Sequence, residues 1–313
     1  VPAGRAVVFI ALAAVAWGTG GAVAAVLFST SGLDAFAVSF WRFAGGTAVL
    51  AAAWPLVRPA GGPSLTDRLR AVPVRPAANG VGMAVFQTAY FAAVDRAGVA
   101  VATVVTLGAG PVFVALGARL WLGERLTRGR AGVTCLAIGG LVLLSMGGAE
   151  AGTASGRWLP GIALALLSAL GYAGTILLGR SLGAGRDGEP LGDTLIGLAV
   201  GTAFLLPVAA FPVPAAAGGL LPQRGDTVVT VALLAYLGLV PSALAYALFF
   251  AGLRTVTAGT ASVLALVEPL TAAAVAVFLL GERLTPAGLA GGVILLAAVA
   301  LLAVGERRSP ASG

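Results

Sequence analysis

The pentapeptide Gly-Glu-Arg-Leu-Thr occupies residues 123–127 and occurs again at residues 281–285, 158 positions later. When residues 96–127 are aligned with residues 254–285 at this offset, twelve of 32 positions are identical. Each copy follows a long apolar stretch that carries a proline at the same place. Chance similarity between Ala/Leu-rich helices does not explain a charged motif after two corresponding stretches, so we expect an internal repeat.

The composition of the chain is that of a membrane protein. Of its 313 residues, 59% are hydrophobic and only 10% are charged, and the mean hydropathy is +1.01. A soluble globular chain carries about 25% charged residues. A soluble enzyme and a disordered chain are therefore excluded, and a protein that crosses the membrane several times is predicted.

Ten apolar stretches are long enough to cross a bilayer as helices, which needs about 20 residues each. They are residues 6–28, 35–57, 77–94, 99–118, 131–148, 158–179, 194–213, 228–251, 257–280 and 286–305. Each half of the chain holds five, an odd number, so the second half crosses the membrane in the opposite sense. The sequence predicts an all-α membrane protein with ten transmembrane helices in two inverted five-helix repeats, residues 1–150 and 151–313.

The basic residues predict the orientation of these spans. All 19 are arginines, and they account for the net charge of +7. With the N-terminus in the cytoplasm, fourteen arginines lie on the cytoplasmic side, four lie outside, and Arg42 lies within a span. Positive charge gathers on the cytoplasmic side of membrane proteins. We therefore expect both termini in the cytoplasm, a bacterial inner-membrane location, and no nucleic-acid partner for this positive charge.

Several kinds of chemistry are excluded by the residues that the chain lacks. It contains no histidine and no lysine, and Cys135 is its only cysteine. A His/Cys metal site, a Ser-His-Asp or Cys-His nucleophile and a lysine Schiff base cannot form. No glycine-rich phosphate-binding loop is present either. The sequence predicts no enzyme, no cofactor and no metal, and it excludes direct drive by ATP.

Glu268 is the one acidic residue deep inside a predicted span. A carboxylate inside a membrane is costly unless it is paired, hydrated or protonated, so such residues are functional candidates. Small residues surround it at helical spacing, which leaves room for a ligand or a close helix. Its equivalent in the first half is Gly110. We expect Glu268 to couple transport to protons; the alternative is a protonated side chain bonded to a neighbouring helix.

Two prolines lie at equivalent positions of the repeats, Pro111 and Pro269. Each removes a backbone donor and frees the carbonyl four residues earlier, at Leu107 and at Ala265. A freed carbonyl in a membrane must find a partner or line a wet cavity. The mirrored placement favours hinges or cavity walls, with a simple packing kink as the alternative.

Aromatic and polar residues mark the walls of a possible solute cavity. Trp17 and Tyr172 are repeat mates at an offset of 155. A cavity for an amphipathic solute needs apolar walls and a few polar anchors. The predicted substrate-binding residues are Trp17, Gln87, Tyr90, Tyr172, Ser242 and Tyr246. Arg42 could bind a substrate carboxylate, but a structural pairing between helices is favoured for it. The glutamates of the repeated motif, Glu124 and Glu282, are expected to pair with an arginine or cap a neighbouring helix, in a structural or gating role.

The combination of these features resembles the EamA-type drug/metabolite transporter superfamily. The similarity covers about residues 6–305 and rests on Trp17-Gly18, Arg42, the paired prolines and the repeated Gly-Glu-Arg-Leu. The resemblance implies an exporter of amino acids or related small metabolites. It also implies a central cavity lined by the first, third, fourth, sixth, eighth and ninth spans.

The sequence thus predicts a secondary active transporter that works by alternating access, in exchange for protons or along the solute gradient. The alternatives are a facilitative uniporter of small amphipathic solutes and a lipid-handling or structural membrane protein. The expected partners are a small-molecule substrate and the lipid bilayer. Small residues on the fifth and tenth spans also permit a homodimer. The identity of the substrate, the direction of transport and its stoichiometry are left open.

Overall fold

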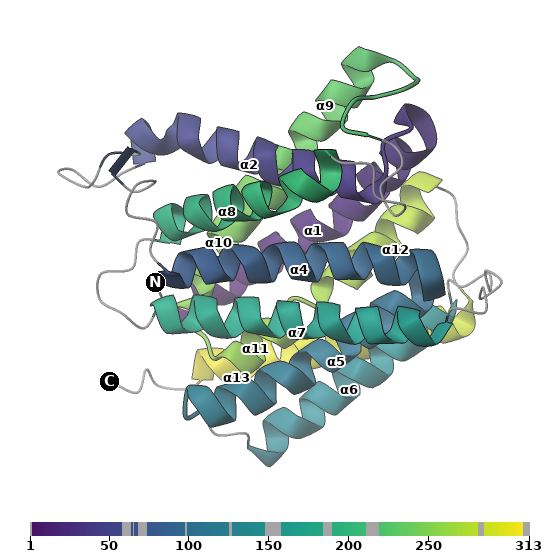
Figure 1. Ribbon diagram of the computed structural model, residues 1–313. Helices are drawn as coiled ribbons and strands as arrows, with labels where there is room; N and C mark the ends of the chain where they lie inside the picture. Colours follow the sequence, from purple (N-terminus) through teal and green to yellow (C-terminus); the bar gives the residue numbers. More distant parts are fainter. Residues whose placement is uncertain are drawn as a thin grey trace.

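The computed structural model describes residues 2–57, 64, 66–67, 74–97, 99–124, 127–147, 158–183, 190–210, 219–280 and 285–308. All regular secondary structure in this part of the chain is helical (Figure 1). The helices of the first half are α1 (Ala3–Ser31), α2 (Ala35–Val57), α4 (Val74–Ala97), α5 (Val99–Trp121) and α6 (Arg128–Gly147). Those of the second half are α7 (Trp158–Gly183), α8 (Pro190–Ala210), α9 (Thr227–Gly238), η1 (Leu239–Leu244), α10 (Ala245–Leu253), α11 (Ala258–Leu264), α12 (Val267–Leu280) and α13 (Pro286–Arg308).

These helices form ten spans. Nine stretches of the described chain are long and apolar enough to cross a membrane; α9, η1 and α10 together make one of them, and α11 with α12 makes another. The remaining span, α4, has 24 residues but is less apolar because it carries Arg75, Asn79, Asp95 and Arg96. The predicted all-α membrane fold is confirmed.

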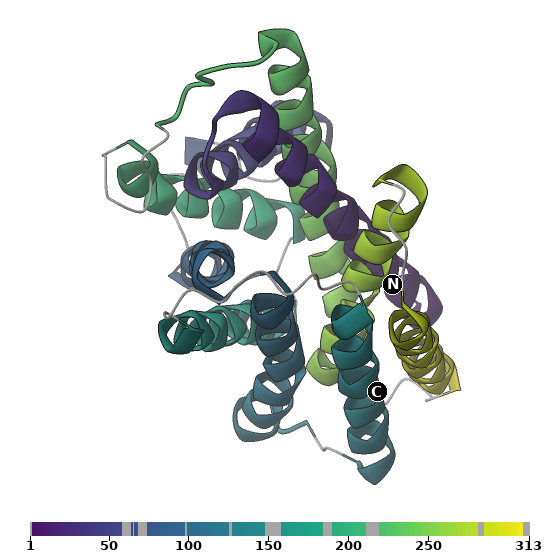
Figure 2. The ribbon, with the colours of Figure 1, turned by 90° about the vertical axis from the view of Figure 1, so that its right-hand side faces the viewer.

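The contacts between helices follow a twofold pattern. The extensive packing of α4 on α7 has its counterpart in α1 on α10, and that of α5 on α7 has its counterpart in α1 on α12. Two further extensive pairs, α2 with α8 and α6 with α13, each join a helix to its own repeat mate, and the packing of α4 on α8 has its counterpart in α2 on α9. Viewed along the spans, α2 with α8 and α6 with α13 lie at opposite ends of the bundle (Figure 2). This is the arrangement that two repeats related by a twofold axis produce.

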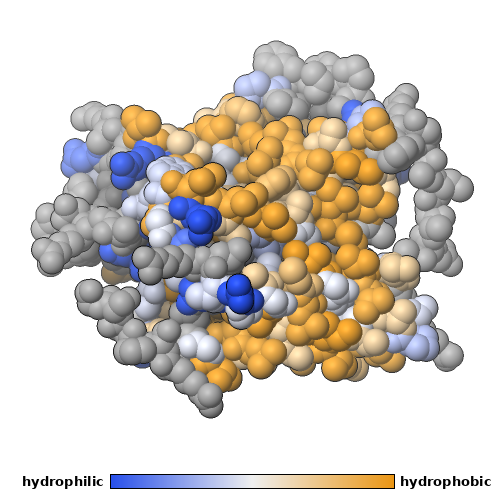
Figure 3. Space-filling model, turned by 90° about the horizontal axis from the view of Figure 1, so that it is seen from below, coloured by the Kyte–Doolittle hydropathy of each residue, from blue (hydrophilic) through white to orange (hydrophobic). Residues whose placement is uncertain are grey.

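The outer surface of the bundle is apolar. Large hydrophobic side chains such as Leu120, Phe278 and Val293 are exposed, as expected for groups that face lipid. Figure 3 shows a broad hydrophobic expanse over the middle of the molecule, with hydrophilic residues gathered at the left. We call the face at that end, where α1 begins and α7 ends, the proximal face, and the opposite face the distal face (Figure 1).

The two faces are not packed alike. Near the proximal face, α10 contacts α7, and α11 contacts both α5 and α7. Twofold symmetry would predict equivalent contacts of α4 with α1 and of α5 with α12 near the distal face. Within the described residues neither pair makes an extensive contact, although the rings of Phe28 and Phe91 meet edge to face with centroids 6.0 Å apart. The bundle is therefore closed more tightly at its proximal face.

Candidate functional site

The ninth span is interrupted next to its proline. Pro269 has no N–H, so the carbonyl oxygen of Ala265 lacks its usual helical donor. That oxygen instead accepts a hydrogen bond of 3.0 Å from the backbone N–H of Glu268. The tight turn ends α11 at Leu264 and starts α12 at Val267. Glu268 thus lies in the first turn of α12, where the helix dipole favours a negative charge.

The backbone of α1 lies directly against Glu268. A Cβ atom added to Gly18 would come within 2.6 Å of the Glu268 carbonyl oxygen and 2.5 Å of the Thr271 Cβ. Only glycine permits this approach. The Glu268 side chain is half-buried, and within the described residues it has no hydrogen bond or ion pair. An unpaired carboxylate of this kind in a membrane span marks a site that a proton or a ligand can occupy.

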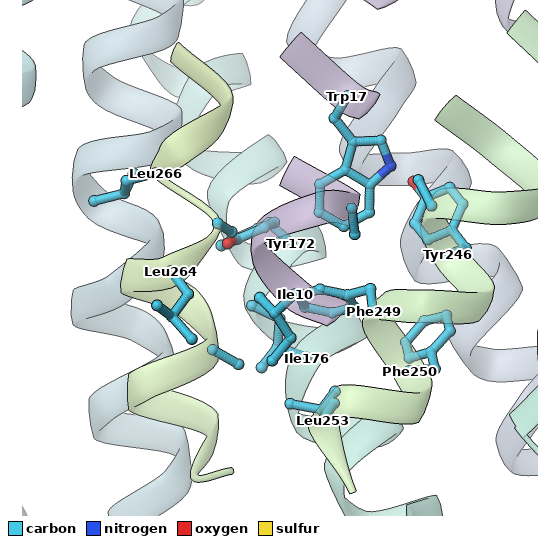
Figure 4. Close-up of a cluster of buried hydrophobic side chains, with 14 of the residues drawn as sticks. Ile10, Trp17, Tyr172, Ile176, Tyr246, Phe249, Phe250, Leu253, Leu264 and Leu266 are labelled. Carbon is cyan, nitrogen blue, oxygen red and sulfur yellow. The ribbon is translucent and has the colours of Figure 1, made fainter. Parts of the chain in front are cut away.

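Trp17 lies within a cluster of aromatic rings. The centroid of its ring is 5.2 Å from that of Tyr246 and 5.1 Å from that of Phe249. Figure 4 shows the indole nitrogen on the side of the ring that faces Tyr246. This nitrogen is buried and has no hydrogen-bond partner in the described part of the chain. An indole N–H can only donate, so this nitrogen is a candidate donor for a solute.

Tyr172, the repeat mate of Trp17, covers Gly110, the repeat mate of Glu268. A Cβ atom on Gly110 would lie 2.8 Å from the Tyr172 Cδ1. The Tyr172 hydroxyl donates to the carbonyl oxygen of Ser262 at 3.4 Å. In the first half a ring therefore covers a glycine, whereas the second half places a carboxylate at the equivalent position.

Three tyrosines from different helices interact electrostatically with the carboxylate. Tyr90 on α4, Tyr172 on α7 and Tyr246 on α10 are each within electrostatic range of Glu268. The hydroxyl of Tyr90 is hydrogen-bonded to that of Thr103 at 2.8 Å. The structure thus brings together aromatic residues that are far apart in the sequence.

Arg42 joins the remaining polar residues to this site. Its Nε donates to the Ser242 hydroxyl oxygen and its Nη2 donates to the Pro241 carbonyl oxygen, both at 3.2 Å. Its Nη1 donates to the Gln87 Oε1 at 3.5 Å. The guanidinium also lies within electrostatic range of Glu268. These bonds join Arg42 of α2 to α4 and η1, and they place its charge beside the candidate site.

The predicted site residues gather around one centre, with one exception. The residues that lie together are Trp17, Gln87, Tyr90, Tyr172, Ser242, Tyr246, Glu268 and Pro269. Pro111 lies inside the uninterrupted helix α5 and lines a small separate pocket with Glu124. The sequence did not indicate Phe43 and Phe86, whose rings lie 6.5 Å from Tyr246 and 5.4 Å from Tyr172. A phenylalanine in a span carries no signal that separates a buried position beside a polar site from a lipid-facing position.

The family of the chain follows from comparison with known proteins. The EamA-like transporter family matches twice, over residues 4–146 and over residues 159–304. These two matches cover most of the sequence, one in each half. The chain belongs to the EamA-like transporter family.

Individual relatives agree with this membership. The chain is 29% identical over 290 residues to "Uncharacterized transporter YwfM" of Bacillus subtilis (strain 168), covering 92% of this chain and 90% of the relative. It is 31% identical over 227 residues to an "Uncharacterized transporter" of Archaeoglobus fulgidus, covering 71% of this chain and 75% of the relative. A solved structure described as "Crystal structure of protein" matches with a TM-score of 0.75 and 19% identity, covering 97% of this chain and 99% of that one. This last similarity concerns the fold alone.

Proposed function

We propose that the chain is a secondary active transporter that exports amino acids or related small metabolites across the bacterial inner membrane, in exchange for protons. The observation that carries the proposal is the carboxylate of Glu268, which is half-buried and unpaired among the described residues. Because this group can hold either a proton or a cationic group of the solute, the two exclude one another. Mutual exclusion at a single carboxylate produces antiport.

The charges around the site support a solute that carries both signs. Glu268 offers a negative charge, and Arg42 supplies a positive charge within electrostatic range of it. The unpaired indole N–H of Trp17 adds a hydrogen-bond donor. An ammonium group would bind at Glu268, and a carboxylate would lie toward Arg42 and Trp17. Amino acids and related metabolites have this pattern of groups.

The walls of the site support a solute with an apolar part. The rings of Trp17, Tyr246 and Phe249 form a contiguous aromatic surface. Small-molecule sites are lined mainly by such surfaces, with a few polar groups that fix the orientation of the ligand. This supports the six residues named above as the substrate-binding set.

The proposed mechanism is alternating access between the two repeats, residues 1–150 and 151–313, with Pro111 and Pro269 as hinges. The break between α11 and α12 supports a hinge at Pro269, because few helical hydrogen bonds would have to change there. The proposed orientation has both termini in the cytoplasm. The proximal face is then cytoplasmic, and the tightly packed conformation described above is closed toward the cytoplasm.

The experiment is a transport assay with a panel of metabolites in proteoliposomes, with and without a pH gradient. The proposal expects one class of solute to accumulate against its gradient only when the pH gradient is present. Solute movement at the same rate with and without the pH gradient would instead indicate a uniporter. Lipid flipping without any solute movement would indicate a lipid-handling protein.

A further inference from the structure

A charged network lies at the proximal face, outside the candidate substrate site. Glu124 follows α5, and both of its carboxylate oxygens accept from the backbone N–H of Ala258, at 3.1 Å each. Its Oε1 also pairs with the Arg180 Nε at 3.5 Å. Arg180, at the end of α7, donates from Nη1 to the carbonyl oxygens of Arg254 at 2.7 Å and of Leu253 at 3.4 Å.

Both charges in this network meet helix ends of the opposite partial charge. Glu124 caps the start of α11, where free N–H groups give a positive end, and Arg180 meets the carbonyl groups that end α10. The side chains of Arg180 and Glu124 are only 23% and 18% exposed. Water and salt therefore screen the pair less than they screen a surface ion pair.

The hydrogen bonds of the network join two groups of helices that would separate if the proximal face opened. Glu124 follows α5 and Arg180 lies on α7, whereas their backbone partners belong to α10, α11 and the turn between them. Contacts of α10 and α11 with α5 and α7 are the ones that have no extensive counterpart at the distal face. A transition that opened the proximal face would have to break these bonds.

The arginine of this network has no counterpart at the equivalent position of the sequence. At the repeat offset, Glu124 corresponds to Glu282 and Ala258 corresponds to Ala100. The helix that carries Arg180 aligns at an offset of 155, which places Ala25 opposite Arg180. The cation of the network is therefore present in one repeat and absent from its equivalent position in the other.

We propose that the pair Glu124–Arg180 is a latch that holds the proximal face closed and biases the protein toward the state that is open at the distal face. The inference rests on the proposed alternating-access transport. In a protein built from two equivalent repeats the two end states would be similar in energy, so a one-sided latch shifts their populations.

The test follows the accessibility of a buried reporter and needs no substrate. Ala118 on α5 is 3% exposed and lines the same pocket as Glu124, so an Ala118→Cys side chain is shielded while the latch is closed. The rate of its alkylation by N-ethylmaleimide is measured on the full chain in nanodiscs, in a Cys135→Ser background. Glu124→Gln and Arg180→Gln should each accelerate alkylation about tenfold, because removal of either charge shifts the population toward the open state.

Three controls make the result specific. The double variant should react no faster than the faster single variant, since the two residues act as one unit. Arg119→Gln removes an exposed arginine of α5 and should leave the rate unchanged. A second reporter, Thr271→Cys on α12, lies on the distal side of Glu268 and should react more slowly in the latch variants, because alternating access closes one face as it opens the other.

Two outcomes would overturn the latch. One is an unchanged alkylation rate at Ala118→Cys in either single variant. The other is acceleration at both reporters together, which would mean loss of folding rather than opening of one face. If the alkylation rates change as expected but the protein moves no solute, the proposed transport function is refuted and the latch is not. The two failures are therefore distinguishable.

Discussion

The hydroxyl of Ser242 donates a hydrogen bond of 2.9 Å to the carbonyl oxygen of Leu237, five residues earlier in the same span. Pro241 cannot donate to that oxygen in the helical pattern, so the serine side chain takes the place of the missing backbone donor. The chain accommodates the proline in the π-helical turn η1. The same hydroxyl oxygen accepts from the Arg42 Nε, which fixes the guanidinium beside the candidate site.

We predict that Ser242→Ala destabilises the protein by about 1–3 kcal/mol, because it leaves the buried carbonyl of Leu237 and one donor of Arg42 without partners. Unfolding in detergent, followed by circular dichroism, measures this free energy. Ser39→Ala is the matched control, since the Ser39 hydroxyl bonds only to the carbonyl of Ala35 within a regular helix. Equal losses in the two variants would show that the Ser242 hydroxyl has no special role.

Two glycines of α1 allow a second comparison. A Cβ atom on Gly18 would overlap Thr271 and the Glu268 carbonyl oxygen, whereas one on Gly21 would meet nothing within 4 Å. We predict that Gly18→Ala lowers the free energy of unfolding by about 1–3 kcal/mol through overpacking. Gly21→Ala should leave this free energy unchanged or raise it by about 0.5–1 kcal/mol, because alanine favours the helix. Thermal unfolding of both variants in the same detergent checks the difference, and a stable Gly18→Ala protein would contradict the close packing of α1 on α12.

The architecture was accessible from the sequence because its signals are local. The length of each apolar stretch and the odd number of spans in each repeat required no knowledge of contacts. The one acidic residue inside a span, Glu268, was likewise visible from composition. The hydrogen bonds of Arg42 to Gln87 and Ser242 could not be predicted from the sequence, because they depend on how three separate helices are positioned along one another.

Local rules also predicted more symmetry than the structure has. Because proline has no N–H, they predict a carbonyl without its helical donor at Leu107 and at Ala265 alike. However, α5 continues through Pro111, whereas the ninth span is interrupted before Pro269. In the second repeat the Glu268 N–H donates to the carbonyl oxygen of Ala265, three residues earlier, and this bond forms a tight turn between α11 and α12. The repeated motif predicted that Glu124 pairs with an arginine or caps a helix, and it does both. Which arginine it pairs with is decided by tertiary packing. Glu282, its counterpart, lies outside the described residues.

The orientation can be tested by cysteine labelling in a Cys135→Ser background. We predict that a cysteine placed at residues 65–70, in the loop after the second span, reacts with an impermeant maleimide only after the inner membrane is opened. This follows from the excess of arginine on the proposed cytoplasmic side. A cysteine in place of the exposed Leu221, on the opposite face, should react in intact cells and serves as the control. Labelling of the first position from outside would reverse the proposed topology.

The last prediction concerns the coupling role of Glu268. Glu268→Gln keeps the size and hydrogen-bonding capacity of the side chain but cannot gain or lose a proton. We predict that solute accumulation under a pH gradient falls to the level measured without a gradient, while exchange of solute across the membrane without a gradient continues. Proteoliposome uptake with both conditions in parallel measures the two activities.

Asp226→Asn is the matched control for this prediction. Asp226 is also an acidic residue, but its carboxylate caps α9 by accepting from the backbone N–H groups of Val228 and Val229, a role that an asparagine oxygen can fill. The substitution removes a charge at an exposed position away from the central site, so coupling should be retained. Both variants lose one negative charge. A difference in coupling between them therefore reflects the position of the lost charge and not the change in net charge. If the Glu268→Gln protein still concentrates solute under a proton gradient at the wild-type rate, Glu268 has a structural role and coupling depends on another group.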